Sequence, residues 1–206
     1  MSHAPFAPSA ADRWLNCSMA GHYAATLPEK PSGPAAEEGT RKHHQAAKHL
    51  LIGDDSTCTG TQLYLDTVRD TPGRQLVEKQ VTIVEGQCWG TSDCIVVGRK
   101  PTVIDFKWGK HPVTAVGNPQ LKLYALGAAQ LVGERGGWDL VIVQPNASAG
   151  MPVKRWTIDF ITLRYFRDQA VRAIDLTLSD ARKPTAGDWC RWCPGQHLCI
   201  ASWAKK

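Results

Sequence analysis

The chain has 206 residues, of which 43% are hydrophobic, and it carries a formal net charge of +5 with a pI near 8.9. That length and apolar content suffice for one well-packed domain covering residues 1–206. No apolar run approaches the roughly 20 residues that cross a bilayer, and the N-terminus lacks a charged segment followed by an apolar core, so we expect a soluble, cytoplasmic protein. The modest positive charge suits an anionic partner.

The first third of the chain is predicted to be mainly helical. Ser9 is a residue type typical of N-caps, and the apolar positions after it predict one helix from Ala10 to about Ala25. Prolines and glycine over residues 26–35 predict a loop, and a second helix is expected from Ala35 to Leu51. Residues 61–68 fit a third helix, although a strand would also fit them.

The middle of the chain predicts a β-sheet. Apolar runs separated by turn residues indicate strands over residues 75–84, 90–97, 103–107, 139–144 and 153–158. Helical patterns follow over residues 119–132 and 159–178. The fold class predicted is α/β, with a central mixed sheet flanked by helices.

Two aspartates on neighbouring predicted strands form the first candidate site. The turn composition of residues 98–101 predicts a hairpin centred near Arg99, which places Asp93 and Asp105 opposite each other on one face. Like charges at that distance repel, so we expect a cation between them. Mg²⁺ or Mn²⁺ suits such oxygen ligands, and Lys107 on the same face could orient a water or stabilise a phosphate. The alternative is a salt-bridged strand surface.

A third carboxylate joins this pair if the preceding turn is tight. With Glu85-Gly86 as the two central residues of a hairpin, Glu78 falls opposite Asp93. A change of one residue in the loop would send Glu78 to the other face of the sheet, so its placement depends on the turn.

The C-terminal region holds the densest set of metal-binding side chains. Three of the seven cysteines, Cys190, Cys193 and Cys199, lie within ten residues and begin with a Cys-x-x-Cys spacing. In a chain without a signal peptide, such a cluster indicates a metal rather than disulfides. Zinc with His197 as fourth ligand and an iron–sulfur cluster with Cys17 both fit, and a free-thiol tail is the remaining alternative.

Several short motifs follow one another in a fixed order. They are Glu38-Gly39-Thr40 followed by His43, Glu78 in a strand, Gly90-Thr91 followed by Asp93, Ile104-Asp105-Phe106-Lys107, and Gln120 followed by Tyr124. This set resembles the PD-(D/E)XK nuclease superfamily in its RecB-like branch. The C-terminal cysteines are similar to those of its iron–sulfur members, the AddB-type helicase-nucleases and the CRISPR-associated adaptation exonucleases, and the chain looks most like a small phage-encoded, stand-alone nuclease. The resemblance extends from about Ser9 to Cys199.

The resemblance implies a role for each acidic motif residue. Asp93 and Asp105 would bind the catalytic metal, with Glu78 nearby as a further ligand. Lys107 corresponds to the lysine that positions the attacking water. Asp105 stands where many members have Glu, a substitution that the motif permits.

The resemblance also assigns residues outside the two strands. His43, rather than His44, matches the histidine that helps to hold the metal, because it lies three residues after Thr40. Gln120 and Tyr124 match the helix motif on the DNA side of the site. The four ligands of a [4Fe–4S] cluster would be Cys17, Cys190, Cys193 and Cys199. The cluster would staple the elements at about residues 9–25 and 186–203 across a core of about residues 35–178.

The implied activity is that of a metal-dependent DNA exonuclease acting on ends or single strands. No Gly-x-x-x-x-Gly-Lys-Ser/Thr motif is present, so unwinding would come from a helicase or recombination partner. A phage-encoded protein would act in the host cytoplasm. A base-stacking surface could use Trp89, Trp108, Trp189 or Trp192, unless these residues belong to the core.

Two other functional classes fit parts of the sequence. A catalytically weak nucleic-acid-binding module of the same fold would be expected to have lost Asp93, Asp105 or Lys107, and none is missing. A zinc-binding structural protein would explain the cysteines but not the hairpin carboxylates.

Overall fold

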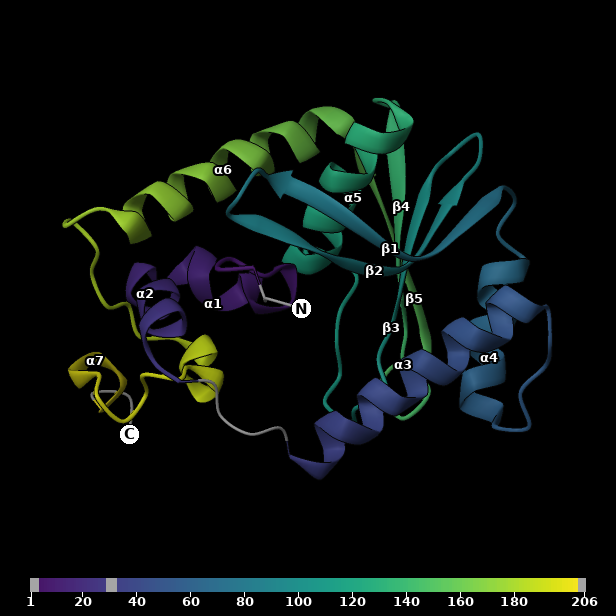
Figure 1. Ribbon diagram of the computed structural model, residues 1–206, viewed down its shortest axis with the longest axis horizontal. Helices are drawn as coiled ribbons and strands as arrows, with labels where there is room; N and C mark the ends of the chain where they lie inside the picture. The colour runs from purple at the N-terminus through teal and green to yellow at the C-terminus, as the bar shows by residue number, and fades with distance from the viewer. Residues whose placement is uncertain (1–3, 29–32, 204–206) are drawn as a thin grey trace.

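The computed structural model describes residues 4–28 and 33–203 and has an α/β fold built on a five-stranded mixed sheet (Figure 1). The strands follow the chain order across the sheet as β1 (Arg74–Val84), β2 (Cys88–Val97), β3 (Thr102–Phe106), β4 (Gly137–Val143) and β5 (Val153–Asp159). Only β3 and β4 are parallel among these neighbours. A parallel pair requires a crossover, and α5 (Pro119–Val132) supplies it. The predicted fold class, a mixed sheet flanked by helices, is confirmed.

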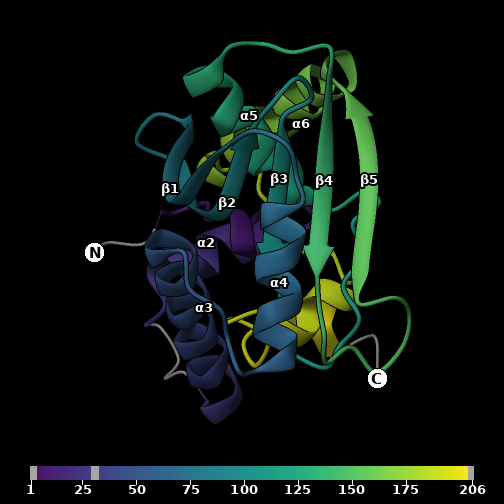
Figure 2. The same cartoon turned by 90° about the vertical axis from the view of Figure 1, so that its right-hand side faces the viewer.

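Helices cover both faces of the sheet. On one face lie α3 (Pro34–Ile52) and α4 (Thr59–Arg69), and Figure 2 shows α4 in front of β3 with α3 at its side. On the other face, α5 and α6 (Phe160–Leu178) pack against the larger hydrophobic core. Because β3 and β4 are covered on both sides, they are apolar almost throughout, as expected of central strands.

The crossover helix begins and packs as its sequence dictates. The Asn118 side chain caps α5 by accepting a hydrogen bond from Leu121 N at 3.1 Å, and Pro119 occupies the first turn. Further along, Gly127 lets the helix approach β1, since a Cβ there would lie 2.8 Å from the Val81 side chain. This close packing holds the middle of α5 against β1, and the first turns of the same helix carry two predicted site residues.

The single helix predicted from Ala10 to Ala25 is wrong. The structure has α1 (Ala11–Asn16) and α2 (Ser18–Thr26), separated by Cys17 in an extended conformation. Ser9 is also not the N-cap, since it lies in the 3₁₀ turn η1 (Pro8–Ala10) and Ala10 precedes α1 without a side-chain cap. Apolar residues continue on both sides of the break, which hides it in the sequence.

The turn between β1 and β2 is one residue longer than predicted. Val84 pairs with Cys88, so three residues, rather than Glu85-Gly86 alone, form the loop. A shift in register between Thr82 and Val84 absorbs the extra residue. The pairing beyond that shift therefore agrees with the prediction, although the turn itself does not.

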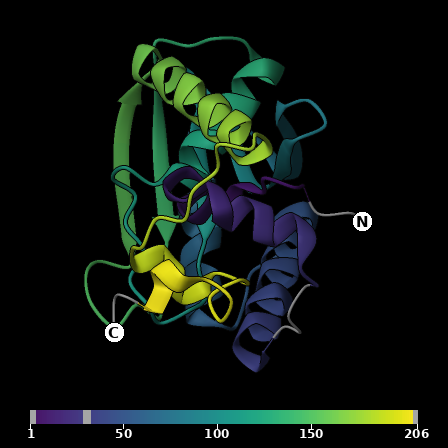
Figure 3. The same ribbon diagram turned by 90° about the vertical axis from the view of Figure 1, so that its left-hand side faces the viewer.

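The N-terminal helices α1 and α2 lie next to the C-terminal segment, beside the sheet (Figure 3). The C-terminal segment contains the 3₁₀ turn η2 (Asp188–Trp192) and the short helix α7 (Ile200–Trp203). Ser18 in α2 ties this segment down, because its Oγ donates to Lys183 O at 3.1 Å and accepts from Lys183 N at 2.8 Å. We call the N-terminal helices α1 and α2 together with residues 183–203 the cap. Within the described residues, no helix has the length and apolar content to span a membrane.

An ion-pair group on the outer strands provides a test of the fold. The carboxylate of Asp139 on β4 lies 2.6 Å from Lys100 Nζ and 3.7 Å from Arg155 on β5. Partial burial of Asp139 opposes ionisation, but hydrogen bonds from Lys100 and Thr157 outweigh it and hold the pKa of this carboxyl below its usual range.

We therefore expect Asp139→Asn to destabilise the protein at pH 7 by about 0.5–1 kcal/mol, because both cations are half-exposed and screened. Since the folded-state pKa lies below the ordinary value of about 4, the contribution is complete above that value and is lost as the pH falls through the folded-state pKa. Urea unfolding of both proteins between pH 7 and pH 3 measures the difference. Asp180→Asn, a change at a fully exposed carboxylate, is the control, and a difference that persisted at low pH would contradict the assignment.

Candidate active site

The two predicted aspartates face each other at the carboxyl end of β3. Pairing of Cys94 with Ile104 continues by one step to Asp93 and Asp105, so both lie on the same side of the sheet. Asp93 Oδ2 also accepts a hydrogen bond from Phe106 N at 2.7 Å. Asp105 is 2% exposed. The predicted hairpin geometry is confirmed.

Lys107 connects this pair to α5. Its Nζ lies 2.8 Å from Asp105 Oδ2 and donates to Gln120 Oε1 at 2.9 Å. Gln120 Nε2 in turn donates to the Tyr124 hydroxyl at 3.4 Å. Burial alone would lower the pKa of Lys107, but the carboxylates of Asp105 and Asp93 outweigh it and raise that pKa. The ammonium is thus held in its charged form.

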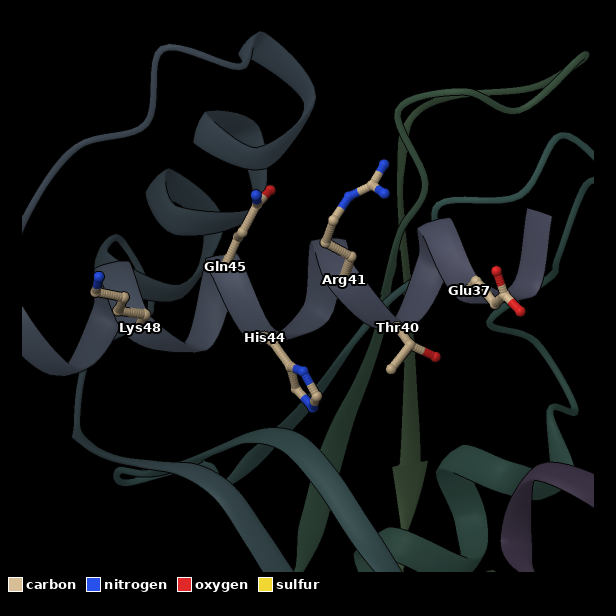
Figure 4. A pocket seen from close by; sticks show the side chains of 6 residues that line it. All are labelled: Glu37, Thr40, Arg41, His44, Gln45 and Lys48. Atoms are coloured by element: carbon tan, nitrogen blue, oxygen red, sulfur yellow. The ribbon is translucent and has the colours of Figure 1, made fainter. Parts of the chain in front are cut away.

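His43 approaches the site from α3. Its Nδ1 lies 3.0 Å from Asp93 Oδ1, and its ring packs against Phe106 with centroids 5.5 Å apart. Burial lowers the pKa of His43. The hydrogen bond with Asp93 and the negative charge of Asp93 raise it by more, so the net shift is upward. His44 instead lines an open groove of about 680 Å³ along α3 (Figure 4). The structure therefore brings His43, rather than His44, to the aspartates, as predicted.

Glu78 is the third carboxylate of the site. Pairing of Val77 with Cys94 and of Lys79 with Ser92 leaves Glu78 opposite Asp93. Glu78 keeps an exposed surface, but partial desolvation where it faces the site, together with repulsion from Asp93, raises its pKa to about 7. Its φ is +48°, which is uncommon for a residue with a side chain and costs of order 1 kcal/mol or more. Such strain is typical of functional sites, and nothing in the sequence indicates it.

The carboxylates are not fully satisfied by the protein. Asp105 Oδ2 is buried and accepts no aligned hydrogen bond from the described residues, although the Lys107 ammonium is close. Burial and the neighbouring charge of Asp93 raise the pKa of Asp105 despite the opposing effect of Lys107. Within the described ranges, no three His, Cys, Asp or Glu side chains are gathered as tightly as the ligands of one ion. Binding an ion would therefore require these side chains to move toward one another.

The cap brings four cysteines to one small cavity. Cys17 from the break between α1 and α2 lines it together with Cys190, Cys193 and Cys199. Backbone amides point at two of the sulfurs, since Thr185 N donates to Cys17 Sγ at 3.3 Å and Gly187 N donates to Cys190 Sγ at 3.4 Å. His197 is exposed and does not line the cavity.

Sequence reasoning missed Gln144, which organises the loop after Lys107. This residue is 1% exposed, and its side chain makes four hydrogen bonds. Nε2 donates to Gly109 O at 2.8 Å and to His111 O at 2.6 Å, while Oε1 accepts from Val113 N and Lys154 Nζ. A buried glutamine at the end of an apolar strand, Leu140–Val143, is the signal that could have identified it.

Fold and site together define an α/β protein with an acidic, lysine-containing site on its central sheet. The chain belongs to the family described as "Protein of unknown function (DUF2800)", whose model matches residues 3–64 and 61–206. Among solved structures, it is similar to one described as "Crystal structure of SSO0001", with 17% sequence identity, a TM-score of 0.49, and coverage of 94% of this chain and 85% of that chain.

Proposed function

We propose that the protein is a metal-dependent deoxyribonuclease of the PD-(D/E)XK type, which hydrolyses phosphodiester bonds at DNA ends or in single strands. The observation that carries the proposal is the convergence of the motif residues. Asp93 and Asp105 face each other on adjacent strands, and Lys107 contacts one of them while His43 contacts the other. A structural ion pair would account for Lys107 with Asp105, but it would not account for the further carboxylate of Glu78 or its strained backbone.

The donor set fits a hard divalent cation. Asp93, Asp105 and Glu78 offer carboxylate oxygens, His43 offers a ring nitrogen, and Asp105 Oδ2 is buried without an aligned hydrogen bond. Oxygen-rich sites of this kind suit Mg²⁺ or Mn²⁺. When bound, such an ion would promote ionisation of water and neutralise negative charge on the phosphate.

The side chains themselves supply orientation. Lys107 is placed by two partners, Asp105 and Gln120, so its ammonium is available at one defined position to hold a water or a phosphate oxygen. Tyr124 supports Gln120 from the next turn of α5. Gln120 thus acts as a positioning residue for Lys107 in this proposal.

The cap fits a cluster held by thiolates. Four cysteine side chains line one cavity of about 10 Å³, so they would have to move apart to hold a cluster. Backbone N–H groups donate to Cys17 Sγ and Cys190 Sγ, and hydrogen bonds of this kind to the sulfurs tune iron–sulfur clusters. Cys17, Cys190, Cys193 and Cys199 would hold a [4Fe–4S] cluster with a structural role, which joins the two ends of the chain. The exposure of His197 argues against zinc held by three cysteines and this histidine.

Digestion of end-labelled DNA tests the proposal. Anaerobically purified protein is incubated with single-stranded and double-stranded substrates in Mg²⁺, Mn²⁺ or EDTA. We expect cleavage with either metal, none in EDTA, and a loss of at least about 10²-fold in Asp105→Ala. Glu134→Ala, a change at an exposed carboxylate, is the control. Cleavage that is equal in the wild type and Asp105→Ala would show that this site is not catalytic, and metal-dependent binding without cleavage would favour a non-catalytic DNA-binding module.

A further inference from the structure

One large aromatic side chain of the cap is unexplained by packing. Trp192, in η2, is 61% exposed, whereas Trp89, Trp108 and Trp189 are partly buried. A tryptophan in the core stabilises the fold because its apolar surface is buried, and most of the Trp192 side chain does not contribute in this way. Single exposed apolar side chains are common on protein surfaces, so a binding role for Trp192 depends on the groups gathered around its ring.

Cationic and aromatic groups from two distant parts of the chain surround this ring. The Arg191 guanidinium lies 5.0 Å from the Trp192 ring centroid. The His111 ring meets Trp192 edge to face, with centroids 6.3 Å apart and an interplanar angle of 70°. Arg191 Nη2 and His111 Nε2 are 3.4 Å apart. We call these three residues the Trp192 platform.

The platform is held in place from both sides. The Trp192 carbonyl accepts a hydrogen bond from Arg13 Nη1 at 3.1 Å, which fixes it to α1. The His111 carbonyl accepts from the buried Gln144 side chain at 2.6 Å. Both hydrogen bonds end on backbone carbonyls, so they fix where the two residues lie, while the rings are oriented by their contacts with each other and with Arg191.

The platform also lies near the candidate active site. His111 is four residues after Lys107, and four residues of extended chain reach at most about 14 Å. A stacked nucleic-acid strand advances about 3.4 Å per nucleotide, so about four nucleotides would bridge this distance. One nucleic-acid strand could therefore contact both the Trp192 platform and the candidate active site.

We propose that the Trp192 platform binds single-stranded nucleic acid, with a base stacked on Trp192 and the backbone phosphates near Arg191. The inference rests on the proposed nuclease function, for which it supplies a binding point for the strand within about four nucleotides of the scissile bond. Every base has a flat face, so such a contact favours unpaired strands without selecting a sequence. A paired end would offer its bases only after fraying.

Binding is measured in EDTA, so that cleavage plays no part. The probe is a fluorescein-labelled 12-nucleotide oligothymidylate, followed by anisotropy, with a blunt duplex of equal length for comparison. We expect Trp192→Ala to weaken single-strand binding about 5- to 100-fold, Trp192→Phe to retain most of it, and duplex binding to change less than about 3-fold. Tyr165→Ala is the matched control, because Tyr165 is 68% exposed on α6 and is also an aromatic residue.

Two further variants protect the test against misfolding of the cap. His111→Ala and Arg191→Gln change the platform without removing a cysteine, and both should weaken single-strand binding, Arg191→Gln with a smaller salt dependence. Equal affinities for the wild type, Trp192→Ala and Tyr165→Ala would overturn the inference even if the wild type cleaves DNA. Weakened binding by Trp192→Ala in a protein that never cleaves would support the platform and reject only the nuclease.

Discussion

If the protein is the proposed nuclease, Lys107→Ala is expected to slow cleavage strongly and to destabilise the fold at the same time. The Lys107 ammonium lies between Asp105 and Gln120, and its loss leaves a buried carboxylate beside Asp93 without a compensating charge. Breaking a buried ion pair costs about 3–5 kcal/mol, and we expect about 2–3 kcal/mol here because a quarter of the Lys107 side chain is exposed. The cleavage rate should fall about 10²- to 10³-fold, the scale on which one oriented electrostatic group acts.

A double variant separates the two effects. Lys107→Ala combined with Asp105→Asn removes both charges, so most of the lost stability should return while the cleavage rate does not recover. Chemical unfolding and end-labelled DNA digestion measure the two quantities on the same preparations. Lys79→Ala, a change at an exposed lysine of β1, should alter neither. A double variant no more stable than Lys107→Ala alone would show that the carboxylates do not repel each other as the structure implies.

The effect of added metal on thermal stability tests whether the site carboxylates, including Asp105, bind a cation. Ligands that bind only the folded state stabilise it by about 2.7 kcal/mol at one hundred times their dissociation constant. Mn²⁺ should therefore raise the melting temperature of the wild type. It should have little effect on Asp105→Asn, which lacks one carboxylate ligand.

Local patterns predicted most of the fold. The strands were predictable because alternating or continuous apolar residues are separated by turn residues, and α5 begins where Asn118-Pro119 indicates. The opposition of Asp93 and Asp105 followed from the turn at Arg99. Once the turn sets which residues of β2 and β3 are paired, the alternation of side chains along each strand fixes the face on which the next few residues lie. Each of these features depends on neighbours close in sequence.

The features that sequence reasoning missed depend on tertiary contacts. The break at Cys17 interrupts an otherwise regular apolar pattern. It is explained by a tertiary contact, in which Thr185 N donates a hydrogen bond to Cys17 Sγ. The positive φ of Glu78 leaves no trace in composition. His111 and Trp192 are in contact although they lie 81 positions apart in the sequence. The buried side-chain amide of Gln144 holds the loop that leads from Lys107 to His111. Propensities of single segments cannot specify such contacts.

The second large effect is expected from the cap. If the cap holds the proposed cluster, replacing any one of its four cysteines by serine should remove that cluster and loosen the contact between the N-terminal helices and the C-terminal segment. A link between Cys17 and the C-terminal cysteines closes a loop of more than 100 residues, for which chain entropy alone gives about 4–5 kcal/mol. For a chain of this size we expect the melting temperature to fall by about 10–20 °C. Iron content, visible absorption and thermal unfolding of anaerobic preparations measure the change.

Matched variants distinguish the possible ligand sets of the cap. Cys58→Ser changes a partly exposed cysteine outside the cap and should keep both iron and stability. His197→Ala should also leave the metal in place if the fourth ligand is Cys17, whereas Cys17→Ser should lose it. Because the extended backbone at Cys17 is what turns this side chain toward Thr185 and the cavity, a helix that ran unbroken through residue 17 would change the direction of the sulfur. Retention of metal by Cys17→Ser but not by His197→Ala would contradict the iron–sulfur assignment and favour zinc.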